Sequence, residues 1–200
     1  MRSLKLACLA GLALFSPVAL LGAVVDFDNL PGGGTIAADT ALTTQYSSIG
    51  VTFSALEDGS PVSAAVINSA SPISGNYWAN TSDGDFGPRW DALIMEFATP
   101  VSGVNWLTQS HGGLSITFNA YDAGNTLLET LVITGNWVPT SFAATGISRI
   151  EALQPDDGWG WGMDSLEFDS AGQVPEPATF AMLALGLATA SLLGRKRRRH

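Results

Sequence analysis

The segment from Leu114 to Tyr121 alternates between apolar and polar side chains along its whole length. A period of two predicts a β-strand with one buried face and one face in water. Residues 122–125 are turn formers, and residues 126–134 return with strand-forming side chains, so the two segments predict an antiparallel hairpin. The apolar face of the first strand consists of Leu114, Ile116, Phe118 and Ala120.

The same pattern of short strand-like segments and turns continues between residues 24 and 172, the stretch that we expect to form one domain. Glycine and proline interrupt it often, and no long stretch shows helical periodicity. Many half-buried strands without helices predict an all-β fold, and we expect an antiparallel β-sandwich with jelly-roll-like connections. The expected strands are 24–27, 50–55, 64–68, 92–97, 101–107, 114–121, 126–134, 141–144, 148–153 and 163–168.

Charge is distributed unevenly along the chain. The stretch 24–174 holds 17 acidic residues and two basic ones, Arg89 and Arg149, which gives it a formal charge of −15. The other seven basic residues lie near the two termini. A body of this charge is not expected to bind nucleic acid or an anionic surface.

Residues 1–23 have the three parts of a secretory signal peptide. Arg2 and Lys5 form a basic start, residues 6–21 are apolar, and Gly22 and Ala23 provide a site for cleavage after Ala23. An uncleaved membrane anchor is the alternative. The single cysteine, Cys8, opens the apolar run instead of closing it, so it is badly placed for lipid attachment; cleavage would leave a mature chain without disulfides.

The other end of the chain predicts a membrane anchor. Residues 178–194 form 17 uncharged positions, and a helix of that length spans roughly 25 Å, just enough to cross a bilayer. Five basic residues follow, and positive charge stays on the cytoplasmic side, so the acidic domain is expected outside the cytoplasm. The basic stop consists of Arg195, Lys196, Arg197, Arg198 and Arg199.

Four residues stand immediately before this anchor: Val174, Pro175, Glu176 and Pro177. With the apolar helix and the basic stop, they resemble the PEP-CTERM sorting signal of Gram-negative bacteria. The resemblance covers residues 173–200. It implies export by the secretion machinery, a stay in the inner membrane, and cleavage by exosortase, a membrane peptidase that passes its substrates to the cell surface or extracellular matrix. It also implies an association with exopolysaccharide and biofilm.

The ends of the domain show a looser resemblance. Residues 25–33 and 45–53 are similar to the opening of many exported bacterial jelly-roll domains, and residues 161–168 are similar to their closing strand. Such domains include carbohydrate-binding modules, some with a structural Ca²⁺. The resemblance therefore implies the fold more strongly than any ligand.

Asp164 is the most specific candidate residue in the body. It shares a strand face with Leu166 and Phe168, so its carboxylate is expected to point toward the core and to need a partner. Backbone N–H groups or an arginine are one solution. A bound Ca²⁺ is the other, with Asp28 as a second ligand if the first and last strands pair.

Two further acidic groups lie in turn-like sequence. Asn80, Asp83, Asp85 and Asp91 fall in one loop, but their spacing departs from the EF-hand pattern, so a solvated turn is expected. Asp156 and Asp157 precede Gly158 and predict another turn.

Tryptophan provides the candidate glycan-binding groups, because sugar faces stack on flat aromatic rings. Trp106 and Trp137 are expected in the core or on the sheet, and packing in the core is the alternative for the others as well. The candidates lie in turn-rich sequence: Trp78, Trp90, Trp159 and Trp161.

Three functions fit these observations. The first is a non-enzymatic surface or matrix protein that binds exopolysaccharide. The second is a glycoside hydrolase or lyase with Glu96 and Glu151 as acid and base, which requires a cleft between the two carboxylates. The third is an adhesion or scaffold protein without a glycan site.

The sequence lacks the residues that several other catalytic and binding sites require. His111 is the one histidine before the tail, and no serine stands in an elbow motif near it. The body has no cysteine for a nucleophile or a zinc site, and no glycine-rich phosphate loop.

Overall fold

The computed structural model describes residues 22–69, 75–79, 91–110, 114–153 and 161–170. Every described strand lies in one compact unit, residues 21–174. The predicted signal peptide and sorting tail lie outside the described residues. Within the described residues, no helix is long and apolar enough to cross a membrane.

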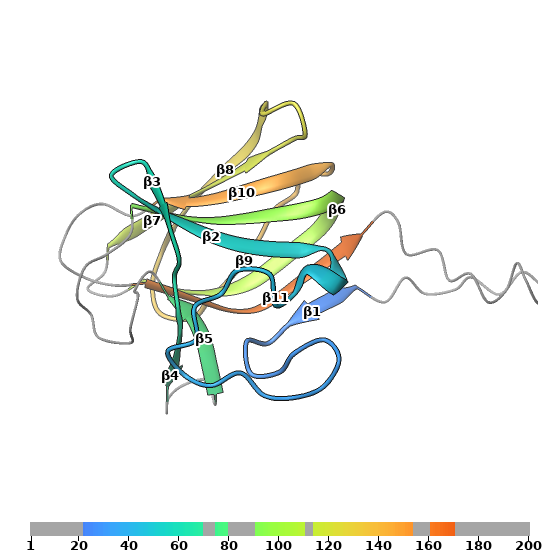
Figure 1. Ribbon diagram of the computed structural model, residues 1–200. Helices are drawn as coiled ribbons and strands as arrows, with labels where there is room; N and C mark the ends of the chain where they lie inside the picture. Colours follow the sequence, from blue (N-terminus) through green and yellow to red (C-terminus); the bar gives the residue numbers. More distant parts are fainter. Residues whose placement is uncertain (1–21, 70–74, 80–90, 111–113, 154–160, 171–200) are drawn as a thin grey trace, which may run out of the picture. The chain divides into compact units, whose positions relative to one another are not determined.

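One long strand, β6 (Ala92–Ser110), belongs to both halves of the fold (Figure 1). Its first half lies between β2 (Val51–Glu57) and β10 (Ile147–Leu153). Its second half lies between β11 (Trp161–Ser170) and β9 (Val138–Ser141). We call the strands around the first half layer A and those around the second half layer B.

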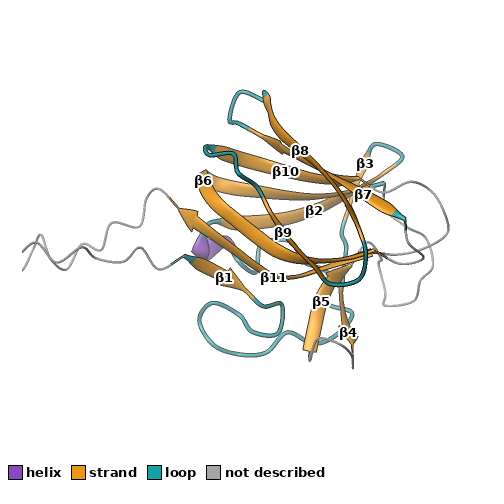
Figure 2. Ribbon diagram, turned by 180° about the vertical axis from the view of Figure 1, so that it is seen from behind, coloured by secondary structure: helices purple, strands orange, loops and turns teal. Residues whose placement is uncertain are grey.

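The remaining strands extend the two layers (Figure 2). In layer A, β7 (Ser115–Tyr121) and β8 (Leu127–Thr134) follow β10, and β3 (Ser60–Val62) follows β2. In layer B, β11 pairs along its other edge with β1 (Ala23–Val25) and with β5 (Gly75–Ala79), which pairs in turn with β4 (Val66–Ser69). All of these pairings are antiparallel. A single 3-10 turn, η1 (Ser47–Ile49), precedes β2.

The inward face of β6 changes along the strand. Leu93, Met95 and Phe97 are buried in the first half, whereas Val104 and Trp106 are buried in the second. Because side chains alternate with a period of two, a change from odd to even positions requires an irregular residue between them. The stretch contains Pro100 and Gly103, and Gly103 has a φ of +60°, a conformation that glycine adopts without strain. The chain thus turns from one layer into the other.

Aromatic rings from the two layers meet in one core. Phe53 of layer A packs edge-to-face on Trp78 of layer B with 4.7 Å between ring centroids. Phe118 of β7 meets Trp161 of β11 at 5.4 Å. These contacts show that the apolar faces of the two layers lie against each other.

The structure confirms several predictions. The fold is all-β and antiparallel, the 114–134 hairpin is present, and the first and last strands pair, Val25 opposite Leu166. At the hairpin turn, Asp122 Oδ1 accepts hydrogen bonds from the N–H groups of Gly124 and Thr126, each at 2.8 Å. The side chain of one turn residue therefore organises the loop.

Other predictions were wrong in detail. The expected strands 92–97 and 101–107 are one strand, because the intervening bend does not interrupt the pairing with β10 and β11. Strands β3 and β5 were missed, and the strand expected at 141–144 lies earlier, at Val138–Ser141. In β5, residues Asn76–Ala79 are all buried, so no alternation between polar and apolar side chains marks it as a strand.

Replacement of Phe118 tests the junction of the two layers. Phe118 is fully buried and touches Trp106 and Trp161, so Phe118→Ala is expected to lower the free energy of unfolding by about 3–5 kcal/mol. Urea unfolding followed by tryptophan fluorescence measures the change. Phe118→Leu is the matched control and should lose less; an equal loss in both variants would contradict the cavity explanation.

Candidate functional site

Asp164 lies where strand β11 passes from one neighbour to another. Residues Gly162 and Met163 pair with β5, and residues 166–168 pair with β1. Between them the register shifts, and Ser165 has a φ of 53°, unusual for a residue with a side chain. We call this place the β1–β5 junction. A backbone conformation of this kind is held only where the surrounding structure enforces it.

Burial of Asp164 was predicted and is confirmed. The residue is 8% exposed, and its Oδ1 accepts a hydrogen bond of 2.6 Å from the N–H of Ser165. A backbone partner was one of the two predicted solutions, and it is present. Asp164, Leu166 and Phe168 are all buried, as predicted, although the register of β11 against β6 shifts between Asp164 and Glu167.

Two more aspartates stand on the other side of the junction. Asp26 Oδ1 accepts hydrogen bonds from the N–H groups of Asp28 and Asn29 at 3.1 and 2.9 Å. Asp28 Oδ1 accepts the N–H of Asn76 at 2.8 Å, which ties the loop after β1 to strand β5. The loop is thus fixed by carboxylates that act as backbone acceptors.

Space at the junction is tight. A Cβ at Gly75 would lie 2.2 Å from Asp28 Oδ2, and Gly75 has a φ of +120°, so only glycine fits there. Asn76 is buried and donates through Nδ2 to the carbonyl of Ile36 at 2.8 Å. The hydroxyl of Tyr46 donates to the carbonyl of Asn29 at 3.0 Å.

The junction has a negative potential. Burial, and to a smaller extent the charges of Asp28 and Asp26, raise the pKa of Asp164 from 3.8 to about 6, although the hydrogen bond from the Ser165 N–H lowers it. Burial and the same two aspartates raise the pKa of Tyr46. The only basic residue in the described ranges, Arg149, instead forms an ion pair with Glu151 in layer A. No described cation therefore balances the junction.

A calcium ion at Asp28 and Asp164 would have to fit this network. Among the described residues, no group of three or more His, Cys, Asp or Glu side chains is arranged to hold a metal ion. Each of the two aspartates already accepts a backbone hydrogen bond through one oxygen. An ion there would use the second carboxylate oxygens and would need carbonyl or water oxygens to complete its shell.

The predicted tryptophan platform is wrong for two of its four residues. Trp78 is fully buried and Trp161 is 3% exposed, so neither ring has a free face for a sugar. Both fill the space between the layers, where a large aromatic surface is most stabilising. Trp106 is buried as expected, and Trp137 packs on Tyr77. Trp90 and Trp159 lie outside the described residues.

Most of the acidic residues predicted in loops lie outside the described residues. Asn80, Asp83 and Asp85 lie outside the described residues, as do Asp156 and Asp157. Asp91 is described, and its Oδ2 accepts a 2.6 Å hydrogen bond from the N–H of Asp58. It thus stabilises the β2–β3 turn, in line with a turn function.

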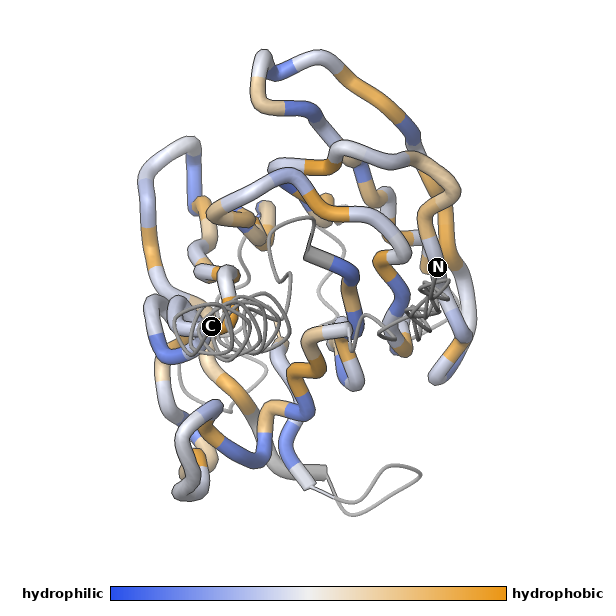
Figure 3. Tube along the Cα trace, turned by 90° about the vertical axis from the view of Figure 1, so that its right-hand side faces the viewer, coloured by the Kyte–Doolittle hydropathy of each residue, from blue (hydrophilic) through white to orange (hydrophobic). Residues whose placement is uncertain are grey.

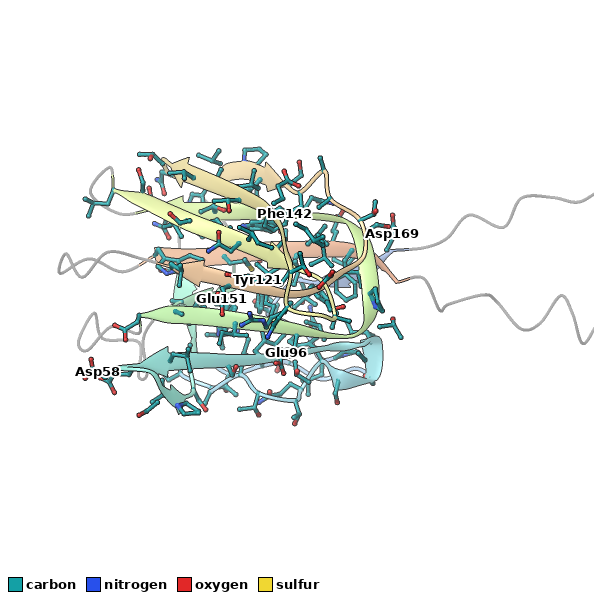
Figure 4. All side chains as sticks on the ribbon, turned by 90° about the horizontal axis from the view of Figure 1, so that it is seen from above. Asp58, Glu96, Tyr121, Phe142, Glu151 and Asp169 are labelled. Atoms are coloured by element: carbon teal, nitrogen blue, oxygen red, sulfur yellow. The ribbon has the colours of Figure 1, made fainter. Side chains whose placement is uncertain are left out.

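The outer face of layer A carries a charged cluster, in which Arg149 joins Glu96 and Glu151, the predicted acid and base (Figure 4). Arg149 Cζ lies 4.4 Å from the ring centroid of Tyr121, and Arg149 pairs with Glu151. Register places Arg149 opposite Glu96 on β6 as well. The alternation of 114–121 already assigned Tyr121 to the polar face; its cation partner depended on the pairing of β7 with β10.

The outer face of layer B contains a groove of about 350 Å³ between β9, β6 and β11. Amide, hydroxyl and carboxylate groups line it beside three apolar side chains. Register places Asn105 between Ser141 on one side and Glu167 on the other. The groove is lined by Asn105, Trp106, Leu107, Pro139, Thr140, Ser141, Ser165 and Glu167.

Comparison with known proteins identifies the tail. Residues 173–199 match the PEP-CTERM protein-sorting motif. The chain carries a PEP-CTERM sorting signal. This confirms the resemblance of the Pro175–Pro177 motif and basic stop, and it indicates an exported precursor that exosortase processes. The described residues do not include the anchoring helix expected at 178–194.

Two solved structures resemble the domain remotely. A search of curated proteins found no significant match. An arabinose-bound MgGH51 α-L-arabinofuranosidase matches with a TM-score of 0.40 and 11% identity, over 66% of this chain and 25% of that chain. The K1 cleaved adhesin domain of Lys-gingipain from Porphyromonas gingivalis W83 matches with a TM-score of 0.35 and 11% identity, over 76% and 99%.

The pH dependence of stability tests the junction. The folded-state pKa of Asp164 lies above its ordinary value, so its ionisation destabilises the fold fully above about pH 6, and this penalty fades as the pH falls toward 4. In chelator, Asp164→Asn should therefore raise stability at pH 7.5 by about 1–2 kcal/mol, with a smaller gain at pH 5.

Thermal melts of both proteins at the two pH values measure this effect. Glu167→Gln, an exposed carboxylate on the same strand, is the control and should change little at either pH. An Asp164→Asn variant that is less stable than the parent at pH 7.5 would contradict the electrostatic account.

Proposed function

We propose that this chain is a non-enzymatic protein of the cell surface or extracellular matrix, which exosortase sorts and which binds exopolysaccharide. The observation that carries the proposal is the PEP-CTERM signal at residues 173–199. The signal peptide at 1–23 and the helix at 178–194 would place residues 24–172 outside the cytoplasm. We further propose that the two layers form a jelly-roll-like β-sandwich, supported by the facing aromatic contacts of the core.

The groove of layer B is the proposed glycan site. It takes the place of the tryptophan platform, because its groups match the chemistry of a sugar. Asn105 and Ser141 can donate to and accept from hydroxyl groups, and Glu167 accepts from them. Leu107 and Pro139 offer apolar surface to the C–H groups of a ring. A pocket that combines apolar surface with a few polar groups is typical of small-ligand sites.

The hydrolase alternative finds less support. Glu96 and Glu151 do lie on the outer face of neighbouring strands, as that hypothesis needs. Glu151 is engaged by Arg149, and the hollow at Glu96, about 220 Å³, is lined by other residues and not by Glu151. A glycosidase requires both carboxylates across one cleft. The non-enzymatic reading is therefore the one we propose.

Binding to the exopolysaccharide of the host tests the glycan proposal. Asn105→Ala should weaken retention of residues 24–172 on immobilised polysaccharide by about tenfold, since a polar contact to a ligand contributes roughly 1–1.5 kcal/mol. Asn119→Ala, an outward asparagine in layer A, is the matched control and should bind like the parent. Equal binding of all three proteins would exclude the groove as the binding site. Absence of binding by the parent would exclude the polysaccharide as the ligand.

The sorting proposal has a separate test. Deletion of exosortase, or Glu176→Ala in the motif, should leave the protein in the membrane fraction at its precursor length. Immunoblots of membrane, surface and medium fractions report this. Glu167→Ala is the control for loss of a nearby carboxylate. An unchanged distribution of the Glu176→Ala variant would show that exosortase does not recognise the motif through Glu176.

Calcium binding at Asp28 and Asp164 is also proposed. The unbalanced charge at the β1–β5 junction supports it, because a divalent cation would offset that charge. The domain should then melt at a higher temperature in Ca²⁺ than in chelator, because a ligand that binds only the folded state stabilises it. This gain in melting temperature should disappear in the Asp164→Asn variant. Equal melting temperatures of the parent across a Ca²⁺ titration would exclude a calcium site.

A further inference from the structure

Strand β8 is the long free edge of the described sheet. It stands at the end of the strand order, is eight residues long, and pairs only with β7, through seven of those residues. The other strands that pair on one side only are β1, β3, β4 and β9, and each has three or four residues. Short edges resist pairing with other chains, and a long edge invites it.

The backbone of β8 is open along its outer side. Among the described residues, no backbone hydrogen bond joins residues 127–134 to any element except β7. The nearest loop is held differently, because the N–H of Ala144 donates to the carboxylate of Glu129 at 2.7 Å and not to the backbone of β8. A row of N–H and C=O groups therefore remains available for a further strand.

The side chains of β8 add apolar surface beside this edge. Val132 is 62% exposed, Leu127 52% and Leu128 38%, which makes three of the five exposed large hydrophobic residues in the described ranges. In Figure 3, hydrophobic and hydrophilic positions are interspersed along the hairpin at the top of the view. Val132 and its neighbour Ile133 are also β-branched strand formers. Strand β8 contains no proline or lysine to block pairing.

Charge indicates which partner fits. In a domain with 17 acidic residues, β8 contains a single one, Glu129, and its carboxylate is directed to Ala144. Two copies of so acidic a domain repel each other over most of their surface, and they repel least where acids are absent. An antiparallel pairing centred on Leu131 would place Glu129 opposite Ile133 of the second copy, so the two glutamates would not face each other.

We propose that β8 pairs antiparallel with β8 of a second copy and continues layer A across two molecules. Such a contact uses the same residues on both copies and closes as a two-fold dimer. A single strand pair is a small interface, so the association is weak in solution and grows with local concentration. It provides a way to join copies at a surface, and it does not depend on the glycan groove.

Sedimentation of residues 24–172 over a concentration series tests the dimer. The parent should shift from monomer to dimer as concentration rises. Val132→Glu should weaken association by roughly tenfold or more, because it places a like charge on each side of the pairing. The matched control is Leu153→Glu, an exposed apolar residue on the internal strand β10, and it should behave like the parent.

Cysteine cross-linking tests the register independently of folding defects. Residues 24–172 contain no cysteine, so a single introduced thiol can form a disulfide only with another copy. Under mild oxidation, at least one of Thr130→Cys, Leu131→Cys and Val132→Cys should dimerise much faster than Leu153→Cys, because a disulfide needs Cα atoms within about 7 Å. A parent that is monomeric at all concentrations, or equal cross-linking at positions 130–132 and 153, would overturn the proposal.

Discussion

The fold depends on the change of inward face within β6. A strand that kept its odd positions inward along its whole length would turn polar positions such as Asn105 into the core and Trp106 into water. The bend between Pro100 and Gly103 shifts the phase by one residue, so that the same strand provides Met95 to one layer and Trp106 to the other. The two layers are thus continuous through one backbone, and the ring contacts of Phe118 and Phe53 close the space between them.

The β1–β5 junction follows from this arrangement. Once β6 occupies one edge of β11, the other edge must serve both β5 and β1, and β11 bends at Ser165 as it passes between them. The loop of Asp26 and Asp28 bridges the two neighbours, and Asp164 lies beside it. Three carboxylates therefore share a crowded place because strands meet there. Their hydrogen bonds stabilise the backbone, while burial, with a smaller contribution from the charges of Asp28 and Asp26, raises the pKa of Asp164.

The sorting signal and the candidate binding surfaces lie in different parts of this protein. The PEP-CTERM signal concerns residues 173–199 and the route of export. The features that could act after export lie on different surfaces of the domain: the groove beside Asn105 on the outer face of layer B, and the edge of β8 at the end of layer A. An acidic domain without disulfides is stabilised by its aromatic core.

The sequence by itself determined the local features. Alternation determined the β7–β8 hairpin, turn chemistry determined the Asp122 loop, and the order of Pro175–Pro177, apolar segment and basic stop determined the sorting signal, because each is a pattern of neighbours along the chain. Only the tertiary structure decided that Trp78 and Trp161 fill the core, that β5 is a strand, and that Arg149 stacks on Tyr121. Those outcomes depend on which strands pair and which faces meet. Such contacts join residues far apart in the chain, and no local pattern records them.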